Sequence, residues 1–167
     1  LTGLAVNSYT FTVTENGCVS PPSSNVAIED ASSTTWNGSI WTNGEPNIDK
    51  GAIISAGPLT ITANLSACSL TINNGVNVIV ASGVTLTIVN AVRTNGSLVF
   101  ENNSSLVQTT NTPNSGNIVY KRISSPMKNF DYTYWSSPVA GQTAKLLSPN
   151  TVAGKFYKYN PTLSWVF

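Results

Sequence analysis

Residues 69–88 read SLTINNGVNVIVASGVTLTI, and this stretch decides the fold. Three short runs alternate apolar residues with Thr or Asn, and the turn residues Gly75 and Gly83 separate them. A period of two is typical of a β-strand with one buried face. Similar runs lie on both sides, so that the set covers residues 58–62, 69–73, 76–80, 84–88, 97–100, 105–108 and 117–120. The sequence therefore predicts an all-β protein.

The spacing of the turns indicates how these strands connect. The residues before the last five runs are Gly75, Gly83, Gly96, Ser104 and Gly116. Short and long spacings alternate, and two successive spacings sum to about 20–21 residues, a length that suits one coil of a β-solenoid. We therefore predict a short parallel β-helix (β-solenoid) of about three to four coils over residues 51–122. The twist of β-strands favours a right-handed coil.

The alternation within the strands also predicts the core. One side of each strand is apolar and would face inward, and the other side carries Thr, Asn and Ser. The inward set is Leu59, Ile61, Leu70, Ile72, Val78, Val80, Leu86, Ile88, Leu98, Phe100, Leu106, Ile118 and Tyr120. An ice-binding array of outward Thr60, Thr71 and Thr87 is a minor alternative, which Val99 and Val107 interrupt in the later coils.

Three further segments flank the predicted solenoid. Residues 1–28 alternate strictly around Tyr9–Thr14, turn at Asn16-Gly17, and resemble the C-terminal strands of an immunoglobulin-like repeat, which is a partial β-sandwich. Residues 29–50 are a linker with a Trp-containing entrance and cap motif. Residues 123–167 are rich in aromatic residues, and we expect them to be the start of a further β domain. We expect the chain to be a slice of a longer protein.

Composition narrows the function. Charged residues make up 9% of the chain, the net charge is +1 and histidine is absent. Such a chain has no electrostatic footprint for nucleic acid, and no apolar run is long enough for membrane insertion. No metal or cofactor is expected, because Asp30, Glu45 and Asp49 lack the spacing of a calcium loop. We expect Cys18 and Cys68, which lie in different domains, not to be bonded to each other.

Four aromatic residues are candidate ligand-binding residues. Trp36, Trp41, Tyr134 and Trp135 could stack on the faces of glycan rings, as exposed aromatics do. The alternative for Trp36 and Trp41 is that they cover the end of the solenoid core and are buried against Ile53, Leu59 or Ile61.

Several motifs resemble one family of bacterial proteins. They are TWNGS at 35–39, NGEP at 43–46, ITANLSACSLTI at 61–72, SSLVQ at 104–108, YKR at 120–122 and YTYWSSPV at 132–139. Together they resemble a module of large multidomain cell-surface adhesins that gliding Gram-negative bacteria export by type IX secretion. The resemblance implies an extracellular, secreted or cell-surface location. It also implies neighbouring domains of the same chain, surface glycans and the type IX secretion machinery as partners.

We expect the function to be that of a non-catalytic structural and adhesive module involved in cell adhesion or gliding motility. The alternative is a carbohydrate-binding module that uses exposed Trp and Tyr. A polysaccharide-active β-helix enzyme is a minor alternative, because residues 51–122 contain one acid, Glu101, and such enzymes need a pair.

Overall fold

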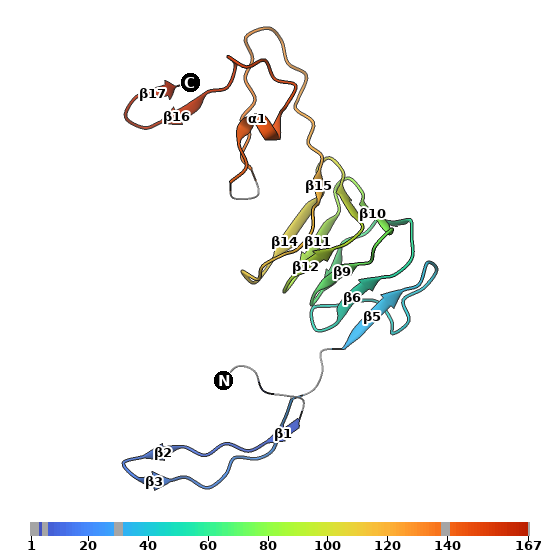
Figure 1. Ribbon diagram of the computed structural model, residues 1–167, viewed down its shortest axis with the longest axis vertical. Helices are drawn as coiled ribbons and strands as arrows, with labels where there is room; N and C mark the ends of the chain where they lie inside the picture. The colour runs from blue at the N-terminus through green and yellow to red at the C-terminus, as the bar shows by residue number, and fades with distance from the viewer. Residues whose placement is uncertain (1–3, 5–6, 29–31, 138–140, 167) are drawn as a thin grey trace. The chain divides into compact units, whose positions relative to one another are not determined.

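The computed structural model describes the chain except residues 1–3, 5–6, 29–31, 138–140 and 167. The chain divides into two compact units, Leu1–Ile123 and Ser124–Phe167. The larger unit contains a stack of parallel strands, drawn in cyan to gold in Figure 1. The division falls where the composition becomes rich in aromatic residues.

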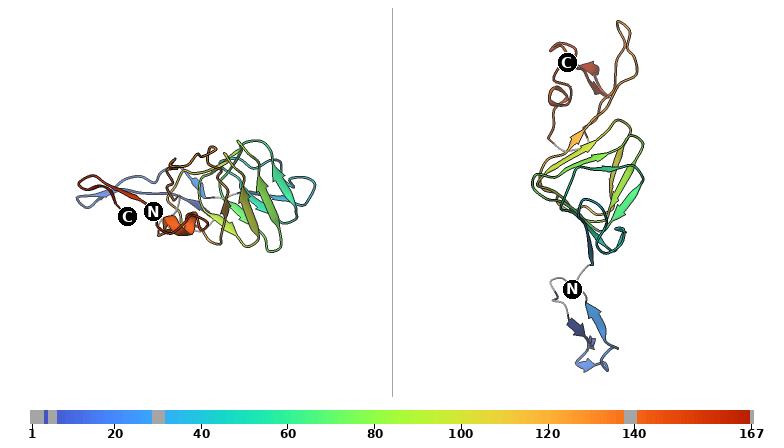
Figure 2. Two further views of the ribbon diagram at one scale, coloured as in Figure 1. Left: turned by 90° about the horizontal axis from the view of Figure 1, so that it is seen from above. Right: turned by 90° about the vertical axis from the view of Figure 1, so that its right-hand side faces the viewer.

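Three parallel sheets form the stack. The first contains β5 (Ser33–Trp36), β6 (Gly51–Ile54), β9 (Leu70–Ile72) and β12 (Val92–Thr94). The second contains β7 (Leu59–Ile61), β10 (Asn77–Val80), β13 (Ser97–Phe100) and β15 (Val119–Tyr120). The third contains β8 (Leu65–Ala67), β11 (Thr85–Ile88) and β14 (Ser105–Gln108). Because consecutive strands visit the three sheets in turn, the chain winds as a coil around one interior (Figure 2).

The strand register confirms a β-solenoid of about four turns. Val78 lies beside Leu59 and Leu98, which are 19 and 20 residues away. In the first sheet Val92 lies beside Leu70, a step of 22 residues. These steps agree with the spacing predicted from the turns. The right-handed winding stays a prediction.

The interior of the solenoid contains the predicted inward set. All thirteen residues belong to the buried core or pack against it, and Phe100 and Val78 are wholly buried. The corners and the first coil add residues that the alternation missed, namely Ala52, Ile54, Ala67, Val76, Val84 and Val92. Thr34, Thr94 and Ser104 are buried as well.

The outward threonines do not form an array. Thr60 lies on β7, Thr71 on β9 and Thr87 on β11, and these strands belong to three different sheets. The ice-binding interpretation is therefore wrong, because the three hydroxyls face different sides of the coil.

The solenoid begins earlier in the sequence than the predicted boundary at residue 51. Strand β5 pairs in parallel with β6, and Trp36 lies beside Ile54. The segment expected to be a linker thus supplies the first strand of a sheet. It has no apolar alternation, because Thr34 occupies the inward position.

The N-terminal segment forms an antiparallel hairpin, as its sequence predicts. Strand β1 (Asn7–Tyr9) pairs with β4 (Val26–Ile28), and β2 (Thr14–Glu15) pairs with β3 (Cys18–Val19). Asn16 and Gly17 have φ values of 50° and 81°, so that both adopt the left-handed conformation of a tight hairpin turn. An immunoglobulin-like sandwich that includes this hairpin stays a prediction.

The smaller unit has little regular structure. Helix α1 (Ala144–Leu147) is one turn long, and the Thr143 hydroxyl caps it by accepting a hydrogen bond from the Leu146 N–H. Strands β16 (Lys158–Asn160) and β17 (Ser164–Val166) form an antiparallel hairpin. No side chain that the structure describes in this unit is buried. In the described part of the chain, no helix has both the length and the apolar character needed to cross a bilayer.

Candidate functional site

Trp36 and Trp41 lie together at the N-terminal end of the solenoid. An isolated antiparallel bridge joins the two residues, and their ring centroids are 5.6 Å apart at an interplanar angle of 63°. Both rings are partly buried and pack against the core. Trp36 lies beside Ile54 in the sheet, whereas Ile53 points to the outer side. Edge-to-face rings present no flat surface to a sugar, so this geometry favours the capping role.

Thr34 fixes the loop that covers the same end. Its hydroxyl donates to the Gly44 carbonyl at 2.7 Å and accepts from the Asn43 N–H at 3.1 Å. The Lys50 ammonium donates to the Asn43 carbonyl at 2.6 Å. A buried hydroxyl that both donates and accepts avoids the cost of an unpaired polar group. The loop from β5 to β6 is therefore held against the first coil.

Tyr120 and Arg122 cover the opposite end of the solenoid. The Tyr120 ring lies 5.1 Å from the buried Phe100 ring, and the Arg122 guanidinium lies 3.9 Å from the Tyr120 centroid. The Tyr120 hydroxyl donates to the Ser104 carbonyl at 3.2 Å and accepts from the Leu106 N–H at 3.3 Å. Arg122 also donates to the Ser104 carbonyl, at 2.6 Å. These side chains occupy backbone groups that a next strand beside β14 would otherwise pair.

Glu101, the acid of the predicted solenoid segment, belongs to an ion pair. Its Oε1 accepts a hydrogen bond from the Lys121 Nζ at 2.7 Å. The pair joins the residues that follow β13 and β15, which are neighbours in one sheet. Glu101 thus helps to hold the last coil.

Tyr134 and Trp135 lie in the smaller unit and are exposed. The Tyr134 ring packs at 5.7 Å on Trp165, which in turn contacts Tyr159 at 5.3 Å. The structure thus separates the four predicted stacking residues into two pairs on different units. The sequence prediction did not include Tyr159 or Trp165, although their aromatic character marked them.

A hollow of about 390 Å³ lies beside Tyr134. Its lining consists of Ser125, Pro126, Met127, Asp131, Tyr132, Thr133 and Tyr134. The Asp131 Oδ2 accepts from the Lys128 backbone N–H at 2.6 Å, and the Tyr132 ring meets the Tyr157 ring edge to face at 5.9 Å. Aromatic rings, hydroxyls and one carboxylate are therefore gathered around a single concavity.

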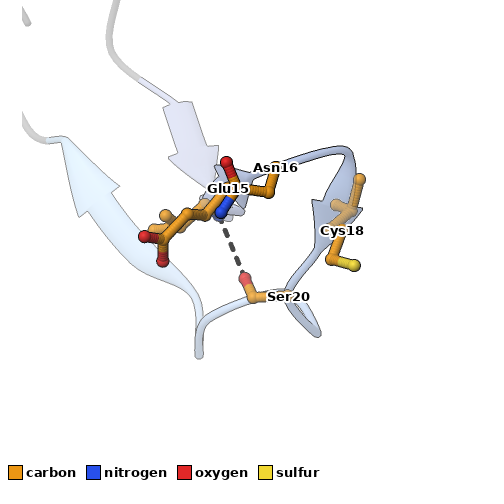
Figure 3. Close-up of a pocket in the computed structure, with 6 residues that line it drawn as sticks. Glu15, Asn16, Cys18 and Ser20 are labelled. Carbon is orange, nitrogen blue, oxygen red and sulfur yellow. Dashed lines mark hydrogen bonds between the residues drawn. The ribbon is translucent and has the colours of Figure 1, made fainter.

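A second hollow, of about 430 Å³, lies at the turn of the N-terminal hairpin (Figure 3). Val13, Glu15, Asn16, Cys18, Val19 and Ser20 line it. The Ser20 hydroxyl accepts from the Val13 N–H at 3.0 Å, which continues the ladder between the hairpin arms. The Glu15 carboxylate and the Cys18 sulfur point away from each other, so they do not form an acid–nucleophile pair.

Cysteines and carboxylates do not gather into a metal site in the described part of the chain. No group of three or more His, Cys, Asp or Glu there is arranged to hold an ion, and Asp30 lies outside the described residues. Cys18 and Cys68 are both free thiols. Cys68 is partly buried, and its sulfur accepts a hydrogen bond from the Asn90 side chain at 3.2 Å.

The sheets and their two covered ends define the class, a short parallel β-solenoid followed by an aromatic-rich unit. The chain belongs to a domain of unknown function family, DUF8693, whose model matches residues 28–166. No curated protein and no solved structure matches the chain. The match spans both units, so the family domain comprises the solenoid together with the aromatic-rich segment. The hairpin strands before Ile28 lie outside it.

Proposed function

We propose that the chain is a non-catalytic structural and adhesive module of a secreted protein on a bacterial cell surface. The observation that carries the proposal is the solenoid with side chains covering both ends. Parallel strands in register give a stiff element, because each coil contacts its neighbours along three sheets. Such an element is suited to hold neighbouring domains at a fixed separation.

The chemistry of the outer surface supports an extracellular location. Lys, Arg, Asp and Glu make up 9% of the chain, and hydroxyls and amides occupy many outward positions of the strands, as at Thr60, Asn77 and Thr87. The resemblance to type IX adhesins adds the export route to the proposal, and the motifs at 35–46 and 120–139 support that part.

Labelling of cells of the bacterium that encodes the chain tests the location. An antibody against residues 28–166 should label intact cells, and a deletion strain should remain unlabelled. Labelling that appears only after permeabilisation would overturn the proposal.

An attachment assay tests the adhesive part. A strain with an in-frame deletion of residues 28–166 should attach to a solid surface less than the parent strain, while the remaining protein is still found outside the cell. Equal attachment with normal export would discard adhesion and leave only a spacer role.

A further inference from the structure

The aromatic-rich unit carries an exposed hollow that the structural role does not use. It measures about 390 Å³, within the roughly 300–1,000 Å³ of small-ligand sites. Tyr132 and Tyr134 are 65% and 78% exposed, although aromatic side chains contribute most when they are buried. Large exposed rings beside a concavity are typical of a surface that binds a ligand.

Both tyrosine rings are braced from outside the hollow. Tyr132 contacts Tyr157, and Tyr134 contacts Trp165, at centroid distances of 5.9 Å and 5.7 Å. Tyr157 and Trp165 are not among the lining residues. A ring that is already held by a second ring loses little conformational freedom when a ligand covers it, so that more of the contact energy appears as affinity.

Asp131 provides a fixed acceptor in the same hollow. One carboxylate oxygen, Oδ2, accepts from the Lys128 backbone N–H, and the other has no partner among the described residues. Ser125 and Thr133 add hydroxyl groups to the lining. A carboxylate of this kind accepts hydrogen bonds from the hydroxyls of a ligand and repels an anionic one.

We infer that this hollow binds a neutral carbohydrate. The C–H face of a sugar ring would cover the Tyr132 or Tyr134 ring, while its hydroxyls donate to Asp131. The inference rests on the proposed adhesive function and names its ligand class. It retains Tyr134 from the candidates in the sequence and assigns no stacking role to Trp36, Trp41 or Trp135.

The test uses residues 1–167 and affinity electrophoresis in gels that contain a soluble polysaccharide. The neutral probes are hydroxyethyl cellulose, xyloglucan and galactomannan, and the anionic probes are alginate and polygalacturonate. At least one neutral probe should retard the chain, and the anionic probes should not. Retardation by none of the neutral probes, or by the anionic probes alone, would overturn the inference.

Variants then locate the site. The double substitution Tyr132→Ala and Tyr134→Ala should weaken binding by about tenfold or more, as for central contact residues. Phe130→Ala is the matched control, because this ring is exposed in the same segment but does not line the hollow, and its binding should be unchanged. Asp131→Asn keeps the size of the side chain, and it should reduce the discrimination against alginate.

Two outcomes separate this inference from the proposed function. If the double variant binds as tightly as the wild type while its melt is unchanged, the hollow is not the binding site. If intact cells are labelled but no neutral probe binds, the surface module stands and the carbohydrate site fails.

Discussion

Gly96 is the position where the smallest substitution should damage the solenoid most. A Cβ atom there would lie 2.2 Å from the Val76 carbonyl oxygen and 2.6 Å from the Asn73 carbonyl oxygen. Both oxygens belong to the backbone of the preceding coil. The Val76 carbonyl accepts from the Ser97 N–H at 2.8 Å, and the Asn73 carbonyl accepts from the Val76 N–H at 3.2 Å. Neither oxygen can move away without breaking these bonds.

The expected cost of Gly96→Ala follows from what must move. Relief of the contact means separating two coils by about 1 Å, since ordinary contacts of this kind exceed 3 Å. That separation forfeits at least one hydrogen bond, worth about 1 kcal/mol, and adds about 1–3 kcal/mol of overpacking. We expect a loss of about 3 kcal/mol in the free energy of unfolding.

Gly83→Ala is the matched control. Gly83 has φ 78°, and nothing lies within 4 Å of a Cβ built there, so that alanine meets backbone strain without a steric contact. That strain costs about 1–2 kcal/mol. Gly83→Asn should cost less than Gly83→Ala, because Asn103 adopts φ 65° at the equivalent position one coil later.

Thermal unfolding followed by circular dichroism checks this order. A difference of 1 kcal/mol shifts the melting temperature by about 4–8 °C for a domain of about this size. Gly96→Ala should therefore melt at least about 4 °C below Gly83→Ala. Equal melting temperatures, or a Gly96→Ala variant as stable as the wild type, would refute the argument from close coil contact.

Three further substitutions test the ends of the solenoid. Trp36→Ala should cost about 3 kcal/mol in urea unfolding, and Trp36→Phe about 1 kcal/mol or less, because the Trp36 ring N–H is buried without an acceptor in the described residues; an unchanged Ala variant would discard the capping role. Tyr120→Phe should lose about 1–2 kcal/mol and self-associate more in sedimentation velocity, whereas a monomer of unchanged stability would contradict a sealed edge. Glu101→Gln should cost under about 1 kcal/mol, and the cost should vanish in high salt, since its pair with Lys121 is largely exposed; a cost that persists in salt would count against this.

The coil was predictable from the sequence because two independent periods agreed. Alternation fixed the inward residues of each strand, and the distance between turns fixed the return of the chain to the same sheet. The turn equivalences were nevertheless one residue out. The register places Gly96 beside Val76 and Asn103 beside Gly83, whereas the spacing had paired Gly96 with Gly75 and Ser104 with Gly83.

That error has a physical origin. The sequence treats every glycine in a turn alike, but two different demands select it here. Gly83 supplies a positive φ, which Asn103 can also supply, whereas Gly96 supplies the absence of a side chain where two coils touch. Only the strand register distinguishes the two demands.

The candidate site was harder to predict, because exposure is a tertiary property. Trp36 and Trp135 are the same residue type in similar Thr- and Ser-rich surroundings, yet one packs on the core and the other is exposed. Strand β5 was missed because its inward residue is Thr34, a polar side chain whose partners lie in the loop ten residues later. A usable signal was the 18-residue step from Thr34 to Ala52.

The covered ends limit where partners can bind. A parallel coil is a template for its own extension, because its last strands present unpaired N–H and C=O groups to the next chain. Here the Tyr120 hydroxyl donates to Ser104 and accepts from Leu106, and so replaces two backbone groups of an absent neighbour of β14. Trp36, Trp41 and Thr34 perform the same service at the first coil. Since stacking end to end would require these contacts to break, partners should bind to the lateral sheets or to the aromatic-rich unit.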